Sequence, residues 1–83
     1  MDEGSTIQHT LVLRRLAPEE NVARFYALMI ERDLFGHVVL VRCWGRIGTR
    51  GRERVDPHSS EDEAAAAMAQ IAAVKRRRGY QDL

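Results

Sequence analysis

Hydrophobic and polar residues alternate along several stretches in the first two thirds of the chain, as they do in β-strands with one face in a core. The alternation predicts four strands, at about residues 8–16, 22–32, 37–46 and 52–55. The second stretch is apolar on both sides, which predicts a central strand. Pro18 and Asn21 mark the first turn and Gly36 the second. Asp56-Pro57 is expected to close the sheet.

The pattern changes to a helical period after Ser60. Ser60 followed by Glu63 forms a capping box, and Gly79 supplies a stop signal. Apolar residues recur at helical spacing in one stripe: Ala64, Ala67, Met68, Ile71 and Val74. The sequence therefore predicts an α+β fold, a small antiparallel sheet of four or five strands with one helix packed across one face. We expect one domain at residues 7–83 and a flexible tail at residues 1–6.

Composition narrows the class of protein. The 83 residues carry 45% hydrophobic and 30% charged residues, the balance of an ordinary globular domain. No signal peptide or membrane-spanning run is expected, and the lone Cys43 fits a reducing, cytoplasmic setting. His9, His37 and His58 lack the partners of a zinc site, so we expect no metal and no cofactor. No catalytic constellation or small-molecule substrate site is evident, which predicts a protein that is not an enzyme.

Charge is concentrated in the segment Arg42–Arg54. This segment holds the only tryptophan, Trp44, and three evenly spaced glycines. Its five arginines against one glutamate give a local net charge of +4 (5 − 1), in a chain of net charge +1. Arginine favours planar contacts to phosphate and carboxylate and also stacks on rings. We therefore expect this segment to carry the function.

Strand alternation divides the third predicted strand into two faces. Val39, Val41 and Cys43 fall on one face, and Arg42, Trp44 and Arg46 on the other. Because unpaired charges are costly to bury, we expect the valine face to meet the helix and the Trp/Arg face to point away. Two interpretations of Trp44 stay open: it stacks on a base or sugar, or it is a partly buried residue covered by arginine stems.

Two further features each have a structural and a functional explanation. Gly45, Gly48 and Gly51 either form an anion-binding nest of backbone N–H groups or allow a tight turn, and the spacing favours the turn. The cluster Lys75–Arg78 either complements the dipole at the helix C-terminus or extends a basic surface. Neither feature decides the function alone.

Several motifs together resemble the WGR domain family. They begin with Asn21 and Arg24-Phe25-Tyr26, continue with Leu34-Phe35-Gly36, and centre on Trp44-Gly45-Arg46 with Ile47-Gly48-Thr49 and Gly51. A helix rich in alanine and ending in Lys75 and Gly79-Tyr80 completes the match. The resemblance spans about residues 7–82. The family is known from DNA-dependent poly(ADP-ribose) polymerases and from bacterial proteins, some of them small.

The resemblance implies roles for individual residues. In those polymerases the domain binds DNA at strand breaks, so Trp44 would pack on a nucleotide and Arg46 would contact a phosphate or a protein partner. Lys75 and Tyr80 match a basic and an aromatic position late in the family helix. Arg52 departs from the family, which usually has Gln there. Within these 83 residues we recognise no catalytic, zinc-finger or regulatory helical domain, so no ADP-ribosylation is expected.

The sequence thus predicts a nucleic-acid-binding module, with DNA ends or breaks as its ligand. Its expected contact residues are Arg42, Trp44, Arg46, Arg50, Arg52, Lys75, Arg77 and Tyr80. The alternative is a protein-interaction module in which Trp44 and Arg46 form the hot spot. A membrane partner is not expected.

Overall fold

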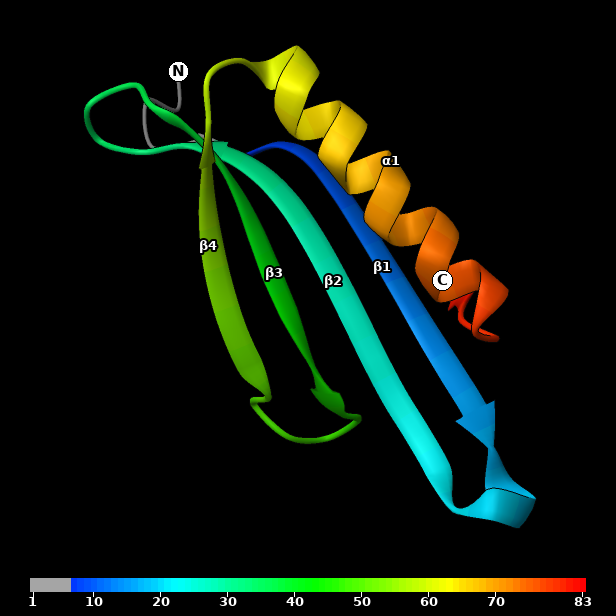
Figure 1. Ribbon diagram of the computed structural model, residues 1–83. Helices are drawn as coiled ribbons and strands as arrows, with labels where there is room; N and C mark the ends of the chain where they lie inside the picture. The colour runs from blue at the N-terminus through cyan, green and yellow to red at the C-terminus, as the bar shows by residue number, and fades with distance from the viewer. Residues whose placement is uncertain (1–6) are drawn as a thin grey trace.

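The fold was analysed in a computed structural model, which describes residues 7–83; the tail predicted at residues 1–6 lies outside them. The elements are β1 (Ile7–Ala17), the 3-10 helix η1 (Pro18–Glu20), β2 (Val22–Arg32), β3 (Val38–Arg46), β4 (Arg52–His58), α1 (Glu61–Arg77) and β5 (Gln81–Asp82). The strands form one antiparallel sheet in the order β4-β3-β2-β1-β5, and α1 runs diagonally across it (Figure 1). The predicted α+β class is confirmed.

Two details of the sheet differ from the four strands that the alternation predicted. β4 continues through Asp56 and Pro57 to His58, so these residues do not close the sheet. Pro57 is tolerated because β4 is an edge strand and a missing N–H there breaks no ladder on the open side. The chain also returns after α1 and adds β5 beside β1, where Leu13 pairs with Asp82.

Helix α1 begins and ends as its capping residues predict. The Ser60 hydroxyl accepts a hydrogen bond from the backbone N–H of Glu63 at 3.1 Å. The Glu63 carboxylate in turn accepts one from the backbone N–H of Ser59 at 2.8 Å, one residue further back than in the usual box. That bond, together with His58, lowers the pKa of Glu63. Gly79 ends the helix with φ +98°.

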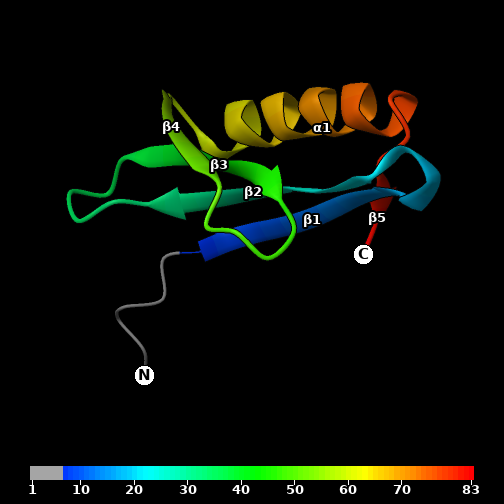
Figure 2. The same cartoon turned by 90° about the horizontal axis from the view of Figure 1, so that it is seen from below.

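The core lies between α1 and one face of the sheet. Figure 2 shows that, in the described part of the chain, the helix covers a single side. The strands contribute the largest fully buried side chains, Leu13, Leu28, Ile30 and Leu40. The helix contributes Ala64, Met68 and Ala72. Because two of these helical residues are alanine, α1 can lie close to the strands, as expected for a core with few aromatic residues.

The predicted orientation of β3 was wrong. Val38 and Leu40 belong to the core beneath α1, and Trp44 packs against that core. Val39, Val41 and Cys43 alternate with them and therefore face the uncovered side of the sheet. The expected cost of burying charge is avoided in two ways, since Arg42 is paired with a carboxylate on β4 and Arg46 is exposed at the strand end.

Candidate nucleic-acid interface

Three aromatic rings gather on the helix-covered face. The pairing of β2 with β3 places Tyr26 directly opposite Trp44, and their rings stack with centroids 5.7 Å apart and planes 16° apart. Tyr80, just after α1, meets Tyr26 edge-on at 6.5 Å. Lys75 reaches back from the end of the helix, with Nζ 4.4 Å from the Tyr26 ring centroid and 5.6 Å from that of Tyr80. The sequence motifs of the strand and the helix thus meet at Tyr26.

Trp44 combines both roles that its sequence context left open. Its stacking on Tyr26 ties it to the core, as expected for a structural residue. It is nevertheless only partly buried, so part of the indole remains on the surface. The half-buried ring is therefore held in a fixed position from one side and accessible from another, which is the arrangement that a stacking platform requires.

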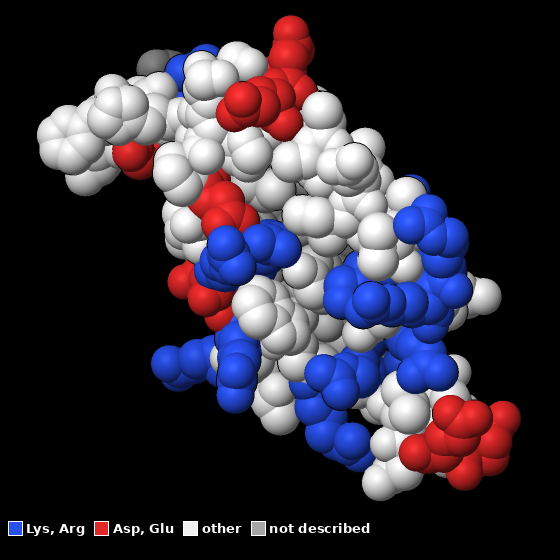
Figure 3. Space-filling model, viewed as in Figure 1, with Lys and Arg blue, Asp and Glu red and all other residues white. Residues whose placement is uncertain are grey.

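Arginines surround these rings because strand pairing brings them to the same face. Figure 3 shows blue side chains gathered over the lower part of this face, with an uncharged area among them. On the sheet the register aligns two pairs of arginines, Arg24 opposite Arg46 and Arg42 opposite Arg54. It also places Arg52 opposite Trp44. The last turn of α1 adds basic residues from the helix side.

Two of these arginines share one carboxylate, so the three groups together keep a net charge of +1 (2 − 1). The Asp56 carboxylate accepts a hydrogen bond from Nε of Arg42 at 3.0 Å and another from Nε of Arg54 at 2.8 Å. Burial of Asp56 opposes its ionisation, but the hydrogen bonds from Arg54 and Arg42 outweigh it and lower the pKa of Asp56. Burial likewise acts against the charge of Arg42, whereas Tyr26 and Asp56 raise its pKa overall. Arg42 and Arg54 are therefore positioned by a structural ion pair.

Many of the cations near the rings have no such partner in the described part of the chain. Within residues 7–83, salt bridges to carboxylates are absent for Arg24, Arg46, Arg50, Arg52, Lys75, Arg77 and Arg78. Burial lowers the pKa of Lys75, and the neighbouring Arg78, Arg24 and Arg42 lower it further by repulsion. An anion bound among these groups would relieve that repulsion, so the face is electrostatically suited to phosphate.

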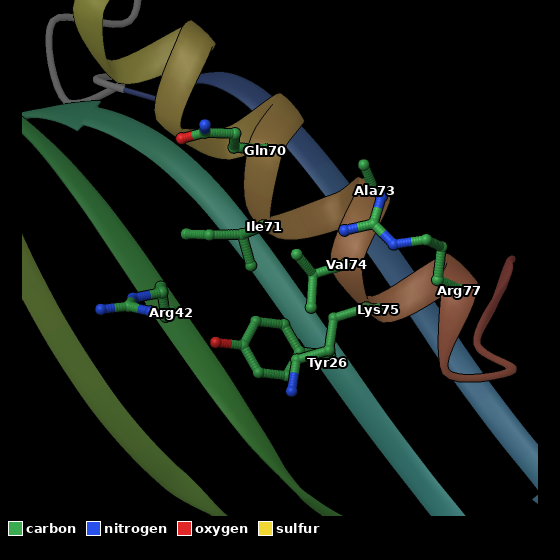
Figure 4. A pocket seen from close by; sticks show the side chains of 8 residues that line it. All are labelled: Tyr26, Arg42, Gln70, Ile71, Ala73, Val74, Lys75 and Arg77. Carbon is green, nitrogen blue, oxygen red and sulfur yellow. The ribbon is translucent and has the colours of Figure 1, made fainter.

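A groove separates α1 from the sheet beside the aromatic rings. It has a volume of about 560 Å³ and combines apolar and basic walls: Tyr26, Arg42, Gln70, Ile71, Ala73, Val74, Lys75 and Arg77. Figure 4 shows the Tyr26 hydroxyl pointing toward Arg42, with Lys75 passing over the Tyr26 ring. The groove therefore offers an apolar wall for a sugar or base and cations for a phosphate.

Most of the predicted site residues come together. Trp44, Lys75 and Tyr80 surround Tyr26, and Arg42 and Arg77 line the groove. Arg52 lies beside Trp44 on β4.

Two predicted residues lie apart from this centre. Arg46 is at the end of β3, where its Nη2 approaches the Asn21 side-chain oxygen at 3.3 Å. Arg50 is in the exposed turn between β3 and β4.

The glycines of this turn serve its backbone geometry. Gly48 and Gly51 adopt φ +94° and +74°. A Cβ at Gly51 would lie 2.4 Å from the Trp44 carbonyl oxygen and 2.9 Å from the Phe25 ring. The backbone N–H of Thr49 is bonded to Arg46 O and that of Ile47 to Ala23 O. Since those donors are already used, the turn interpretation is preferred over an anion nest.

The predicted contact residues did not include Tyr26, Arg24 or Arg54. Tyr26 was assigned to a strand and to the family motif but given no role in the site, yet its ring is the contact point for Trp44, Lys75 and Tyr80. The available signal was register: antiparallel pairing around the Gly36 turn brings Tyr26 opposite Trp44.

Other kinds of site find little support. Among the residues that the structure describes, no group of three or more His, Cys, Asp or Glu is placed to hold a metal ion. Cys43 is on the uncovered face, where burial and the nearby Glu53 raise the pKa of its thiol. In the described part of the chain no helix is long and apolar enough to cross a membrane.

Comparisons with known proteins identify the family of this chain. The chain is 43% identical over 72 residues to the uncharacterized protein y4dW of Sinorhizobium fredii. The matched region is 87% of this chain but 35% of the relative, so the chain spans about a third of that protein. No solved structure gave a significant match. The model of the WGR domain matches residues 9–83, and the chain therefore belongs to the WGR domain family.

Proposed function

We propose that this protein is a non-catalytic module that binds DNA at strand ends or breaks through the helix-covered face. Membership of the WGR family supports a nucleic-acid-binding type of module. The observation that carries the proposal is the group of cations around Trp44, Tyr26 and Tyr80 that have no carboxylate partner within residues 7–83. A cluster of basic side chains on one face is the electrostatic footprint of a nucleic-acid-binding protein, because backbone phosphates supply the opposite charge.

The two kinds of side chain serve different parts of the ligand. The exposed part of Trp44 stacks on the base or sugar of a terminal nucleotide, because a strand end exposes a ring face that an intact duplex keeps stacked. Arg52 and Lys75 flank this position and contact phosphates, and Arg77 extends the basic wall along the helix. Arg42 is held by Asp56, so it offers its remaining donors in a fixed orientation.

A titration against nicked, blunt-ended, intact circular and single-stranded DNA at two salt concentrations tests the proposal. We expect nicked and blunt DNA to bind more tightly than the intact circle, with affinity falling steeply as salt increases. Equal affinity for all four ligands would refute recognition of ends. No binding at low salt would refute nucleic-acid binding and favour a protein partner at Trp44 and Arg46.

A further inference from the structure

Three arginines lie side by side across the helix-covered face of the sheet. Arg15 on β1 pairs with Arg24 on β2, and Arg24 pairs in turn with Arg46 on β3. Because side chains alternate along a strand, this arginine row faces the same side as Tyr26 and Trp44, each two residues away on its strand. Like charges in directly opposite positions destabilise a sheet, and an anionic ligand would offset that repulsion.

Carboxylates compensate only the β1 end of the arginine row. Oε1 of Glu20 lies 3.9 Å from Nη2 of Arg15. Across residues 7–83, Arg24 and Arg46 take part in no salt bridge. Arg46 instead donates to the neutral backbone and side-chain oxygens of Asn21 at 3.5 and 3.3 Å. With Glu20 included, the row therefore keeps a net charge of +2 (3 − 1).

The acidic residues near the arginine row lie along its borders. Glu19 and Glu20 are in η1, in the turn beyond the outer side of the row. Asp82 is on β5, beside β1, and accepts two hydrogen bonds from Arg76 at 2.8 Å. Repulsion from the acidic turn would therefore direct a bound polyanion across the strands toward Trp44, and not off the end of the sheet.

The arginine row is open to a narrow ligand. Figure 1 shows the β1–β2 hairpin extending past the end of α1. The segment after the helix comes close to Arg15, since a Cβ added at Gly79 would lie 3.0 Å from Arg15 Nε. The Arg15 side chain nevertheless keeps 34% exposure, and Arg24 and Arg46 are exposed. A flexible single strand can follow this recess, whereas a wide and stiff duplex meets the segment after α1 before it reaches Arg15.

We propose that the arginine row binds the backbone of a short single-stranded tail, so that the preferred ligand is a DNA end with an overhang. The inference rests on the proposed function, in which Trp44 holds the nucleotide at the strand end. Residues two apart on a strand are separated by about 7 Å, so the row lies within reach of the phosphates next to that nucleotide. A basic track beside an aromatic platform is a common way of binding a single strand.

The length of the arginine row limits the length of the tail. Three strands about 4.8 Å apart span about 10 Å, and the arginine side chains reach somewhat further. The row therefore holds about two or three phosphates. Each phosphate contact on a single strand contributes about 0.7 to the slope of log affinity against log salt, so a bound tail should steepen that slope by about 1.4–2.

Titration of DNA ends that carry tails of increasing length tests the proposal. The ligands are a blunt duplex and matched duplexes with 5′ or 3′ tails of about one to six nucleotides. For one polarity at least, affinity at about 0.1 M salt should increase roughly tenfold with tail length. The increase should level off at about three nucleotides, where the row ends.

Arg24→Ala and Arg14→Ala are the matched variants for this titration. Both remove one exposed arginine, but Arg14 is adjacent to Arg15 on β1 and therefore points to the uncovered face. In Arg24→Ala the gain in affinity from the tail should fall at least about threefold, and the added salt slope should decrease by about 0.7. Arg14→Ala should keep the full gain. Circular dichroism of both variants establishes that they are folded.

The outcomes distinguish this inference from the proposed function. Binding of blunt and tailed ends with equal affinity, for both polarities, would overturn the tail site and leave recognition of ends standing. No binding to any of these ends would overturn both proposals. A tail gain that persists undiminished in Arg24→Ala, or that is lost equally in Arg14→Ala, would show that the arginine row does not hold the tail.

Discussion

The two faces of the sheet are built from the same four long strands but differ in kind. The helix-covered face has an aliphatic core at one end and a cluster of aromatic rings and cations at the other. The uncovered face is apolar in the centre, with Arg14, Glu31 and Glu53 around it. Hydrophobicity alone therefore does not identify the side that a helix covers in this protein. The location of the charge partners does identify it, because the ion pair with Asp56 allows Arg42 to lie on the side that the helix covers.

The difference also separates two kinds of surface. On the helix-covered face, unpaired cations give long-range attraction for an anionic ligand and the rings give short-range contact. The uncovered face instead offers an apolar centre with few charges. Variants confined to the uncovered face should therefore leave DNA binding intact.

The largest expected effect comes from Gly51, in the turn between β3 and β4. Gly51→Ala brings Cβ against the Trp44 carbonyl and the Phe25 ring, so the turn must shift while φ stays positive. We expect a loss of about 3 kcal/mol or more in the free energy of unfolding. Chemical denaturation measures it.

Gly48→Ala is the matched control for that experiment. Gly48 also has positive φ, but nothing lies within 4 Å of its added Cβ. Only the backbone strain applies, which costs about 1–2 kcal/mol. Equal losses for the two variants would show that close packing around Gly51 is not the reason for its glycine.

Sequence patterns predicted the fold well because its signals are local. The capping residues Ser60 and Glu63, the stop at Gly79 and the turn glycine Gly36 each act within a few residues. The orientation of β3 was mispredicted because the contact that decides it joins residues far apart in the sequence. The ion pair of Arg42 depends on Asp56, fourteen residues away on another strand.

The candidate site was likewise predictable only where its signals are local in the sequence. Trp44 and the basic helix end stand out in the sequence, whereas the role of Tyr26 depends on register. Its ring joins Trp44 from the sheet to Lys75 and Tyr80 from the C-terminal segment, and only the folded arrangement shows that contact.

Asp56→Asn should have an intermediate effect. Removing this partly buried carboxylate leaves Arg42 and Arg54 unpaired and should destabilise the protein by about 1–2 kcal/mol at neutral pH. The folded pKa of Asp56 is below its ordinary 3.8, so its stabilisation is present above that value and lost as pH falls through the folded pKa. Thermal unfolding of both proteins from neutral to acid pH measures the difference.

Asp82→Asn is the control, because its partner Arg76 is on the exposed helix end. We expect a smaller change in melting temperature than for Asp56→Asn. If the difference between Asp56→Asn and the original protein persisted at the lowest pH, the ion pair would not be its cause.

Arg52→Ala should have the smallest effect, and only on binding. It removes one unpaired cation next to Trp44, so DNA affinity should fall uniformly across sequences. The slope of log affinity against log salt should decrease in magnitude by roughly one. Arg32→Ala is the control, since Arg32 is paired with Glu61 at the other end of the face. An unchanged slope for Arg52→Ala would remove Arg52 from the binding surface.

The most direct test of the proposed function compares Trp44→Ala with Val55→Ala, one variant on each face. Both must first be shown to be folded, because Trp44 also packs on Tyr26. In a titration with nicked DNA, Trp44→Ala should lose about 1–3 kcal/mol of affinity with little change in salt slope, since no phosphate contact is removed. Val55→Ala should bind as the original protein does. A folded Trp44→Ala protein with unchanged affinity, or an equal loss in Val55→Ala, would contradict DNA binding through the helix-covered face.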